Sequence, residues 1–241
     1  MISKHWDCRY IPGPRRGLYA NRNHAALACR GTHIRTMDDD HEFPDEHCKA
    51  VQTSVESDPD SIWIFGEYHE EPNAFSKLYL PGEIQPRGFS NLPNNLDDCF
   101  AISDGACVYP KRIFENHRYL EIFKFGNLYL EFGARLKSLG YCIRYYPKTY
   151  IIHHIIPDSR SFNDENLQRK SAFLSAYLTY GIYFFNSFRK FECISYFFAI
   201  SLLNILRPKY YSFNLLDFFQ TWRLGVRYGD IFRSGQHNQM I

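Results

Sequence analysis

Residues 33–44 read HIRTMDDDHEFP, and this stretch decides how the rest of the chain is interpreted. Its first five residues have the composition of a short strand, and Asp38, Asp39 and Asp40 follow that strand directly. Three adjacent carboxylates repel one another, so a fold that keeps them ordered normally needs a cation. Oxygen ligands suit Mn²⁺ or Mg²⁺, which bind through one or two carboxylates together with a substrate phosphate. A solvated acidic turn is the alternative, because short acidic runs usually lie at the surface.

The segments on either side of the acidic triplet predict an alternation of helix and strand. Residues 18–30 have helical spacing and are followed by Gly31, residues 43–55 begin a helix near a proline, and residues 61–69 read as a strand. Ligands of open α/β sheets gather at the carboxyl ends of the strands. Because the acidic triplet follows a strand, we expect the functional site there.

The second half continues this alternation after a long irregular segment. Residues 70–97 are rich in proline and glycine without a clear period, which is typical of a lid, a binding segment or a mobile loop. Beyond it we expect a strand over 99–108, helices over 111–116 and 127–139, and strands over 141–146 and 150–156. Pro147 is expected to separate the last two strands.

The order and spacing of five elements resemble the family 2 glycosyltransferases over roughly residues 15–160. They are the run ANRN at 20–23 with its helix, HIRTM with the acidic triplet, Asp104-Gly105 with the helix after it, LEFGARL at 130–136, and Tyr146-Pro147 with His153. The resemblance implies a GT-A fold, which is an α/β sandwich that binds nucleotide-diphospho-sugars.

By this resemblance Asp38 and Asp40 form the D-x-D pair of the family and serve a divalent metal, Mn²⁺ or Mg²⁺. Asp40 is the residue expected on the metal itself, and Asp38 is also expected near the ribose or the sugar. His153 matches the family's late histidine, which contacts the metal or the phosphate. Its neighbour His154 is the alternative candidate for that role.

The resemblance also implies a donor site and a reaction. Asp38, Asp39 and Arg22 are expected to bind a nucleotide-activated sugar. The sugar would be transferred, with inversion, to a glycan or a lipid-linked acceptor. The metal neutralises the departing diphosphate, and a carboxylate takes the proton of the acceptor hydroxyl.

The identity of that carboxylate is open, because the family's usual Glu-Asp pair falls on Leu128 and Tyr129. Glu131 lies in the first turn of the next helix, where the helix dipole stabilises an anion, and is one candidate catalytic residue. Asp104 is the other. The alternatives are an i,i+4 surface ion pair between Glu131 and Arg135, and an ordinary turn aspartate at position 104.

Members of the family begin with a strand, a helix and a second strand that hold the nucleobase, and this chain starts after them. We therefore expect residues 1–160 to form an N-terminally incomplete GT-A domain, active only if the missing part is supplied. A second hypothesis is a catalytically inactive remnant that binds a membrane or a partner. A third, a metal-dependent nucleotidyl- or phosphotransferase, finds no support in the second half.

Residues 161–241 predict a helical, aromatic-rich appendage. Its runs Ser171–Phe188 and Cys193–Leu206 contain no charged residue, and basic residues flank them. The hydroxyl and amide side chains of the first run disfavour a membrane-spanning helix. Two interpretations remain: a helix that lies on an anionic membrane surface, and a helical pair packed on the catalytic domain.

Composition excludes other classes of protein. Twenty-eight Lys and Arg balance 26 Asp and Glu, for a formal charge of +2, and this argues against a nucleic-acid-binding protein. The seven cysteines form no C-x-x-C pair, so we expect reduced thiols and no zinc site. We expect a cytoplasmic protein, peripheral on the inner face of the plasma membrane if it binds a membrane.

Overall fold

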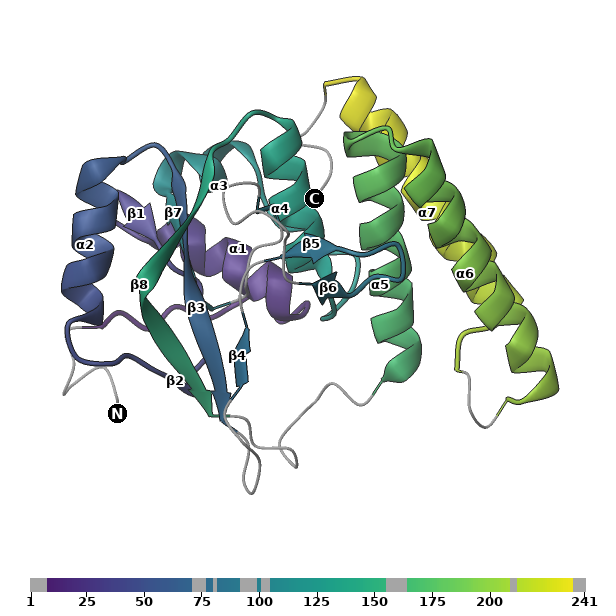
Figure 1. The fold of residues 1–241 in the computed structure, drawn as a ribbon, viewed down its shortest axis with the longest axis horizontal. Coiled ribbons are helices and arrows are strands. Elements are labelled where there is room, and N and C mark those ends of the chain that lie inside the picture. Colours follow the sequence, from purple (N-terminus) through teal and green to yellow (C-terminus); the bar gives the residue numbers. More distant parts are fainter. Residues whose placement is uncertain are drawn as a thin grey trace.

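The computed structural model describes residues 8–70, 77–79, 82–91, 99–100, 105–154, 164–208 and 212–235. In chain order its elements are α1 (Leu18–Ala28), β1 (His33–Ile34), β2 (His41–Glu42), α2 (His47–Ser57), β3 (Ile62–Glu70), β4 (Lys77–Tyr79), β5 (Glu83–Ile84), β6 (Ser90–Asn91), β7 (Cys107–Pro110), α3 (Lys111–Asn116), α4 (Leu128–Ser138), β8 (Ile143–His154), α5 (Glu165–Leu178), the π-helical turn η4 (Thr179–Tyr183), α6 (Ser187–Leu206) and α7 (Leu215–Arg233) (Figure 1).

A mixed six-stranded sheet forms the centre of the fold. Its strand order is β1-β7-β3-β8-β2, and β4 pairs with β3 beside this path. The two long strands, β3 and β8, run parallel, whereas the short strands pair antiparallel with them or with each other. The structure therefore confirms the expected α/β class.

Alternating side chains of β3 supply both faces of the sheet. Ile62 and Ile64 belong to the large core cluster, whereas Trp63 and Phe65 belong to a smaller cluster that includes Val51 of α2. This period of two is what a strand buried on both faces requires. Helix α2 therefore covers one face, and α4 lies on the other (Figure 1).

The prediction that Pro147 ends a strand was wrong, because β8 continues through it. The parallel register pairs Ile64 with Tyr145 and then Gly66 with Tyr150, so the chain between the two tyrosines faces only Phe65. Proline donates no hydrogen bond and is tolerated in a strand at such an irregularity. The irregularity lets one strand carry both predicted segments.

Other helices and strands begin or end at residues different from the predicted ones, for local reasons. Helix α2 begins at His47 and not at residue 43. Pro44 forms a turn before the helix, and its carbonyl accepts the N–H of His47 at 3.1 Å. Helix α3 spans the predicted residues, and α1 and α4 are shorter than predicted by no more than two residues at either end. The segment expected to be irregular contains the short strands β4, β5 and β6 in its described parts.

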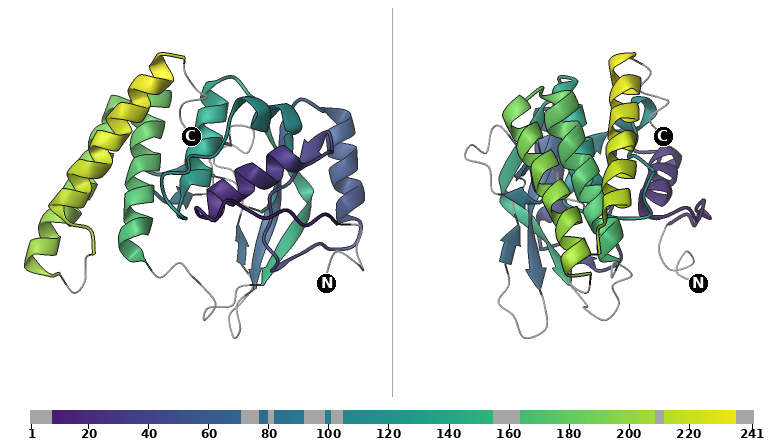
Figure 2. Two further views of the ribbon diagram at one scale, coloured as in Figure 1. Left: turned by 180° about the vertical axis from the view of Figure 1, so that it is seen from behind. Right: turned by 90° about the vertical axis from the view of Figure 1, so that its right-hand side faces the viewer.

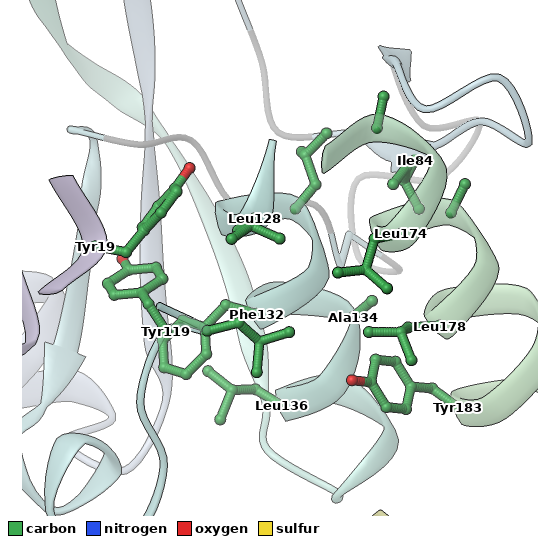
Figure 3. Packing of buried hydrophobic residues seen from close by; sticks show 14 of the residues in the cluster. Tyr19, Ile84, Tyr119, Leu128, Phe132, Ala134, Leu136, Leu174, Leu178 and Tyr183 are labelled. Carbon is green, nitrogen blue, oxygen red and sulfur yellow. The ribbon is translucent and has the colours of Figure 1, made fainter. Parts of the chain in front are cut away.

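The main core continues from the sheet through α4 into the C-terminal helices (Figure 3). Leu128, Phe132 and Leu136 of α4 recur at helical spacing as an apolar stripe and are fully buried. Leu174 and Leu178 of α5 belong to the same cluster. A domain boundary near residue 160 stays a prediction, since apolar packing runs without a break from α4 to α5.

Helices α6 and α7 form the outer layer on α5 (Figure 2). Two glycines let α7 lie close to α5 and η4. A Cβ on Gly225 would lie 2.5 Å from Tyr177 of α5, and one on Gly229 would lie 2.5 Å from Ile182 of η4. Within the described part of the chain, none of the helices has the length and apolar character needed to cross a bilayer.

The buried His47 predicts a pH dependence of stability. Its Nε2 lies 2.7 Å from Nη1 of Arg35 and its Nδ1 lies 2.9 Å from Oγ1 of Thr149. Burial, reinforced by the charge of Arg35, lowers the pKa of His47 from 6.5 to about 4. The unfolded chain therefore takes up a proton at a pH where the folded chain does not, and stability falls as the pH falls through this window.

We expect the free energy of unfolding to drop by about 2–3 kcal/mol between neutral pH and about pH 4 through this group. Urea denaturation at several pH values measures it. His47→Gln should flatten the pH dependence, whereas His24→Gln, at an exposed position of α1, should not. An unchanged slope in His47→Gln would contradict the assignment.

Candidate functional site

The acidic triplet lies in the loop that joins β1 to the edge strand β2. Strand β2 pairs antiparallel with the end of β8, with His41 opposite His153. The backbone carbonyl of Asp40 accepts the N–H of His154 at 2.9 Å. This pairing places the side chain of Asp40 beside that of His153, although 113 residues separate them in the sequence.

His153 bridges two carboxylates. Its Nε2 lies 3.3 Å from Oδ2 of Asp40, and its Nδ1 lies 2.8 Å from Oε1 of Glu67. The same Oε1 of Glu67 lies 2.8 Å from Nε2 of His69. Glu67 and His69 come from β3, which pairs parallel with β8 and sets His69 opposite His153. Three strands thus meet at one group of titratable side chains.

His41 closes the group from β2. Its ring packs edge-on against that of His153, with centroids 4.6 Å apart, and its Nδ1 accepts the backbone N–H of Asp38 at 3.3 Å. The sequence leaves room for this ring at Gly105, where a Cβ would lie 2.0 Å from Cε1 of His41. Any side chain at position 105 would therefore displace the histidine.

The two facing histidines have opposite pKa shifts. Burial and the charge of His153 lower the pKa of His41 below its ordinary value. Burial also opposes protonation of His153, but the hydrogen bond and charge of Glu67, with the charge of Asp40, outweigh it and raise the pKa of His153. The carboxylates thus favour positive charge at the Nε2 edge of His153.

The residues around His153 fit a divalent cation. When the neutral ring donates Nδ1–H to Glu67, the lone pair of Nε2 faces Oδ2 of Asp40. The two electron-rich atoms repel each other, and a positive ion between them would remove this repulsion. Oδ1 of Asp40 is buried and has no hydrogen-bond partner among the described residues. Ligand atoms of Asp40, His41 and His153 all lie within 4.8 Å of one another, as do those of Glu67, His69 and His153.

Of the two neighbouring histidines, His153 is the one beside Asp40. His154 points to the other side of the strand, where its Nε2 lies 2.8 Å from Oε2 of Glu42 and its Nδ1 lies 3.3 Å from Oε2 of Glu70. Successive side chains of a strand alternate between its faces, so only one of the pair can join the group.

Of the predicted donor residues, Asp38 and Asp39 lie in the same loop, and Arg22 reaches Asp38 from α1. Nη2 of Arg22 donates to Oδ1 of Asp38 at 2.9 Å, and the arginine side chain is only 6% exposed. Burial opposes the charge of Arg22, but Asp38 outweighs it and raises the pKa of the guanidinium. Asp39 is exposed. The triplet therefore divides into an arginine-bound, an exposed and a histidine-bound carboxylate.

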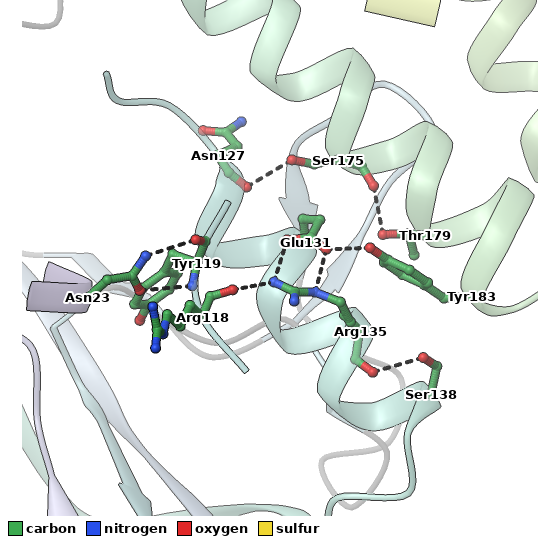
Figure 4. Close-up of polar contacts among 10 residues, drawn as sticks. All are labelled: Asn23, Arg118, Tyr119, Asn127, Glu131, Arg135, Ser138, Ser175, Thr179 and Tyr183. Carbon is green, nitrogen blue, oxygen red and sulfur yellow. Dashed lines mark hydrogen bonds and ion pairs between the residues drawn. The ribbon is translucent and has the colours of Figure 1, made fainter. Parts of the chain in front are cut away.

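Of the two predicted catalytic carboxylates, only Glu131 falls within the described residues, and it lies outside this group. Asp104 lies outside the described residues. Glu131 is fully buried in α4, where Nε and Nη2 of Arg135 lie 2.8 Å and 3.3 Å from its two oxygens and the hydroxyl of Tyr183 donates to it (Figure 4). The i,i+4 ion pair considered as an alternative is present, and it is buried rather than at the surface. A catalytic role of Glu131 stays a prediction.

The site contains three residues that were not predicted from the sequence: Glu67, His69 and His41. A signal for the first two was present, because they stand two residues apart in the predicted strand and so share one of its faces. Their meeting with His153 depends on the pairing of β3 with β8, which no local pattern specifies. His41 directly follows the acidic triplet and was not considered as part of it.

The buried ion pair of α4 gives a prediction that separates a structural from a catalytic role. Glu131→Gln leaves the buried guanidinium of Arg135 without its counter-charge, and we expect a loss of about 3–5 kcal/mol in the free energy of unfolding. Glu165→Gln is the matched control, since Glu165 makes an exposed i,i+4 pair with Arg169 in α5 and should change stability by less than about 1 kcal/mol. Urea denaturation measures both; an unaltered stability of Glu131→Gln would show that the carboxylate is not structural.

Comparisons with known proteins agree with this architecture. Residues 1–118 match the model of glycosyl transferase family 2. Among solved structures, the chain is similar to one described as the crystal structure of GalNAc-T7 with UDP, GalNAc and Mn²⁺. The TM-score is 0.56 at 13% sequence identity, over 68% of this chain and 35% of that one. No curated protein sequence matches the chain.

The chain thus spans about a third of the GalNAc-T7 chain, and at this identity the likeness concerns the fold. The family match covers the acidic triplet and the strands β1, β2, β3 and β7 that surround it. Residues 1–118, just under half of the chain, thus match family 2 of the glycosyltransferases, and the chain shares the GT-A fold of the similar structure.

Proposed function

We propose that the protein transfers a sugar, with inversion, from a nucleotide-activated donor to a glycan or a lipid-linked acceptor, and that it needs a divalent metal. The observation that carries this proposal is the contact between Asp40 and His153, which belong to the two motifs most characteristic of the family resemblance. The structure similar to this chain contains UDP, GalNAc and Mn²⁺, which supports a nucleotide-sugar and metal chemistry for this fold.

Asp40 and His153 would hold the metal, Mn²⁺ or Mg²⁺; His41 lies beside them, but its Nδ1 already accepts the N–H of Asp38. When bound, the ion supplies positive charge that offsets the charge of the departing diphosphate. Asp38 is held by Arg22, and we propose that these two residues and the exposed Asp39 contact the donor. His154, which is paired with Glu42 and Glu70, is not needed for this site.

A carboxylate would accept the proton of the acceptor hydroxyl as it attacks the anomeric carbon. Both oxygens of Glu131 are engaged by Arg135 inside the core, which leaves them poorly placed to meet an acceptor. Asp104 directly precedes Gly105, which lies against His41. We therefore favour Asp104 over Glu131 for this role.

The test is a thermal melt with Mn²⁺ and a panel of nucleoside diphosphates. We expect one nucleotide to raise the melting temperature of the wild-type protein only when the metal is present, because a ligand that binds the folded state alone stabilises it. Asp40→Ala and His153→Ala should weaken metal-dependent binding at least tenfold, whereas the neighbouring His154→Ala should leave it unchanged.

Two other outcomes would contradict the proposed function or the proposed site. No shift with any nucleotide in the wild type would favour the alternative function, a catalytically inactive remnant that acts as a binding module. Equal losses in His153→Ala and His154→Ala would contradict the geometry of the site.

We also propose that the outer face of α6 lies on a membrane surface. Its large apolar side chains are exposed at helical spacing along the whole helix, from Phe188 and Phe191, which are 76% and 70% exposed, to Ile205 and Leu206, which are 64% and 77% exposed. Cys193, Phe197 and Ile200 on the opposite side of the helix are buried. A soluble helix normally shows mainly polar groups on its solvent face, whereas on α6 large apolar side chains predominate there and the exposed polar residues are Ser187 and Ser195.

Charge supports an anionic membrane as the partner of this face. Residues 187–241 carry seven Lys and Arg against three Asp and Glu, whereas the chain as a whole is nearly balanced. Arg189 lies at the start of α6, Arg207 follows its end, and Arg223 and Arg227 are exposed on the neighbouring α7. Aromatic side chains with basic flanks suit the interface of a bilayer, and anionic lipids are concentrated in the cytoplasmic leaflet. A lipid-linked acceptor would be met at that surface.

Vesicle flotation tests the membrane proposal. We expect binding to vesicles of phosphatidylcholine and phosphatidylserine, weaker binding at high salt, and little binding to phosphatidylcholine alone. Phe191→Ser combined with Leu206→Ser should reduce binding about tenfold, because each removes exposed apolar surface from the interface. Tyr10→Ser combined with Leu27→Ser, at exposed positions far from α6 in the sequence, is the control. Equal binding of both double variants would overturn the proposal.

A further inference from the structure

We infer that Glu67 is a positioning residue: it fixes the imidazole ring of His153 so that Nε2, and not Nδ1, faces Asp40 and the metal. This inference rests on the metal site proposed above. It concerns a residue outside the acidic triplet and the late histidine, on a different strand from both.

The geometry assigns each ring nitrogen of His153 a separate partner. Nδ1 lies 2.8 Å from Oε1 of Glu67, within hydrogen-bond distance, and Nε2 lies 3.3 Å from Oδ2 of Asp40. A carboxylate that accepts Nδ1–H holds the ring in one tautomer and leaves the lone pair of Nε2 for a metal. Without that acceptor the ring could rotate or exchange tautomers, and the ligand atom would no longer be fixed.

The environment of Glu67 explains why this residue can hold the ring of His153. The residue is 5% exposed, and a carboxylate at such a position is costly unless hydrogen bonds satisfy it. His69 also approaches Oε1 at 2.8 Å, so two imidazoles share one oxygen. At Glu67, strand β3 is paired with β4 on one side and with β8 on the other. Glu67 is therefore better fixed than a residue of the acidic loop.

The alternative is that Glu67 binds the metal directly, together with His69 and His153, since these three also have ligand atoms within 4.8 Å of one another. The two roles differ in what they require of the side chain. A hydrogen-bond acceptor can be replaced by the amide oxygen of glutamine, whereas an anionic ligand cannot.

The experiment is titration calorimetry of the full chain with Mn²⁺ alone, together with ¹⁵N NMR of the His153 ring without metal. We expect Glu67→Ala to weaken Mn²⁺ binding about 10–100-fold and Glu67→Gln to retain most of the affinity. In NMR spectra recorded at a pH high enough to keep His153 neutral, Glu67→Ala should convert the ring from a single Nδ1–H tautomer to a mixture, a change that a loss of stability alone does not produce.

Glu70→Ala is the matched control, because Glu70 lies on the same strand and pairs with Nδ1 of His154 as Glu67 pairs with Nδ1 of His153. Glu70→Ala should leave both the Mn²⁺ affinity and the tautomer of His153 unchanged. Equal loss of affinity in Glu67→Gln and Glu67→Ala would overturn the inference in favour of direct ligation, and wild-type affinity with an unchanged tautomer in Glu67→Ala would overturn it outright. If the wild-type protein binds no Mn²⁺ while the tautomer still changes, the proposed metal site fails and the positioning role of Glu67 stands.

Discussion

The parallel pairing of β3 with β8 is the interaction on which the candidate site depends. It aligns Ile62 with Ile143 at one end and Glu70 with His154 at the other. Because side chains alternate along both strands, this register brings His69, Glu67 and His153 to one face, and a shift by a single residue would separate them. The edge strand β2 then adds Asp40 from the other side of β8. This group of carboxylates and histidines forms because three separate strands meet at the same place.

A second constraint is the buried ion pair of α4. Glu131 and Arg135 lie on a helix with the sheet on one side and the C-terminal helices on the other, and Tyr183 of η4 donates to the same carboxylate. The family resemblance predicts both charged residues but not the tyrosine. Through this contact and the apolar packing of α5, the C-terminal helices pack directly against the part of the chain that carries the sheet.

The sequence predicted most helices well because their signals are local. Helix α3 spans the predicted residues, and the stripe of Leu128, Phe132 and Leu136 identified α4 together with its buried face. Pairing between strands is not local, and the misses follow from that. A proline rule that holds for regular ladders failed at Pro147, where β8 passes an irregularity. Two adjacent histidines could not be told apart, because only the register of β8 decides which one faces Asp40.

The close contact of α7 with the rest of the chain has a consequence for biosynthesis. Phe218 of α7 stacks on Phe173 of α5 with ring centroids 5.1 Å apart, and Gly225 and Gly229 seat the helix further along. Helix α7, which covers α5, is synthesised after it. Until α7 emerges, an aromatic surface continuous with the main core stays open to solvent, and exposed apolar surface of this kind makes a nascent chain prone to aggregation.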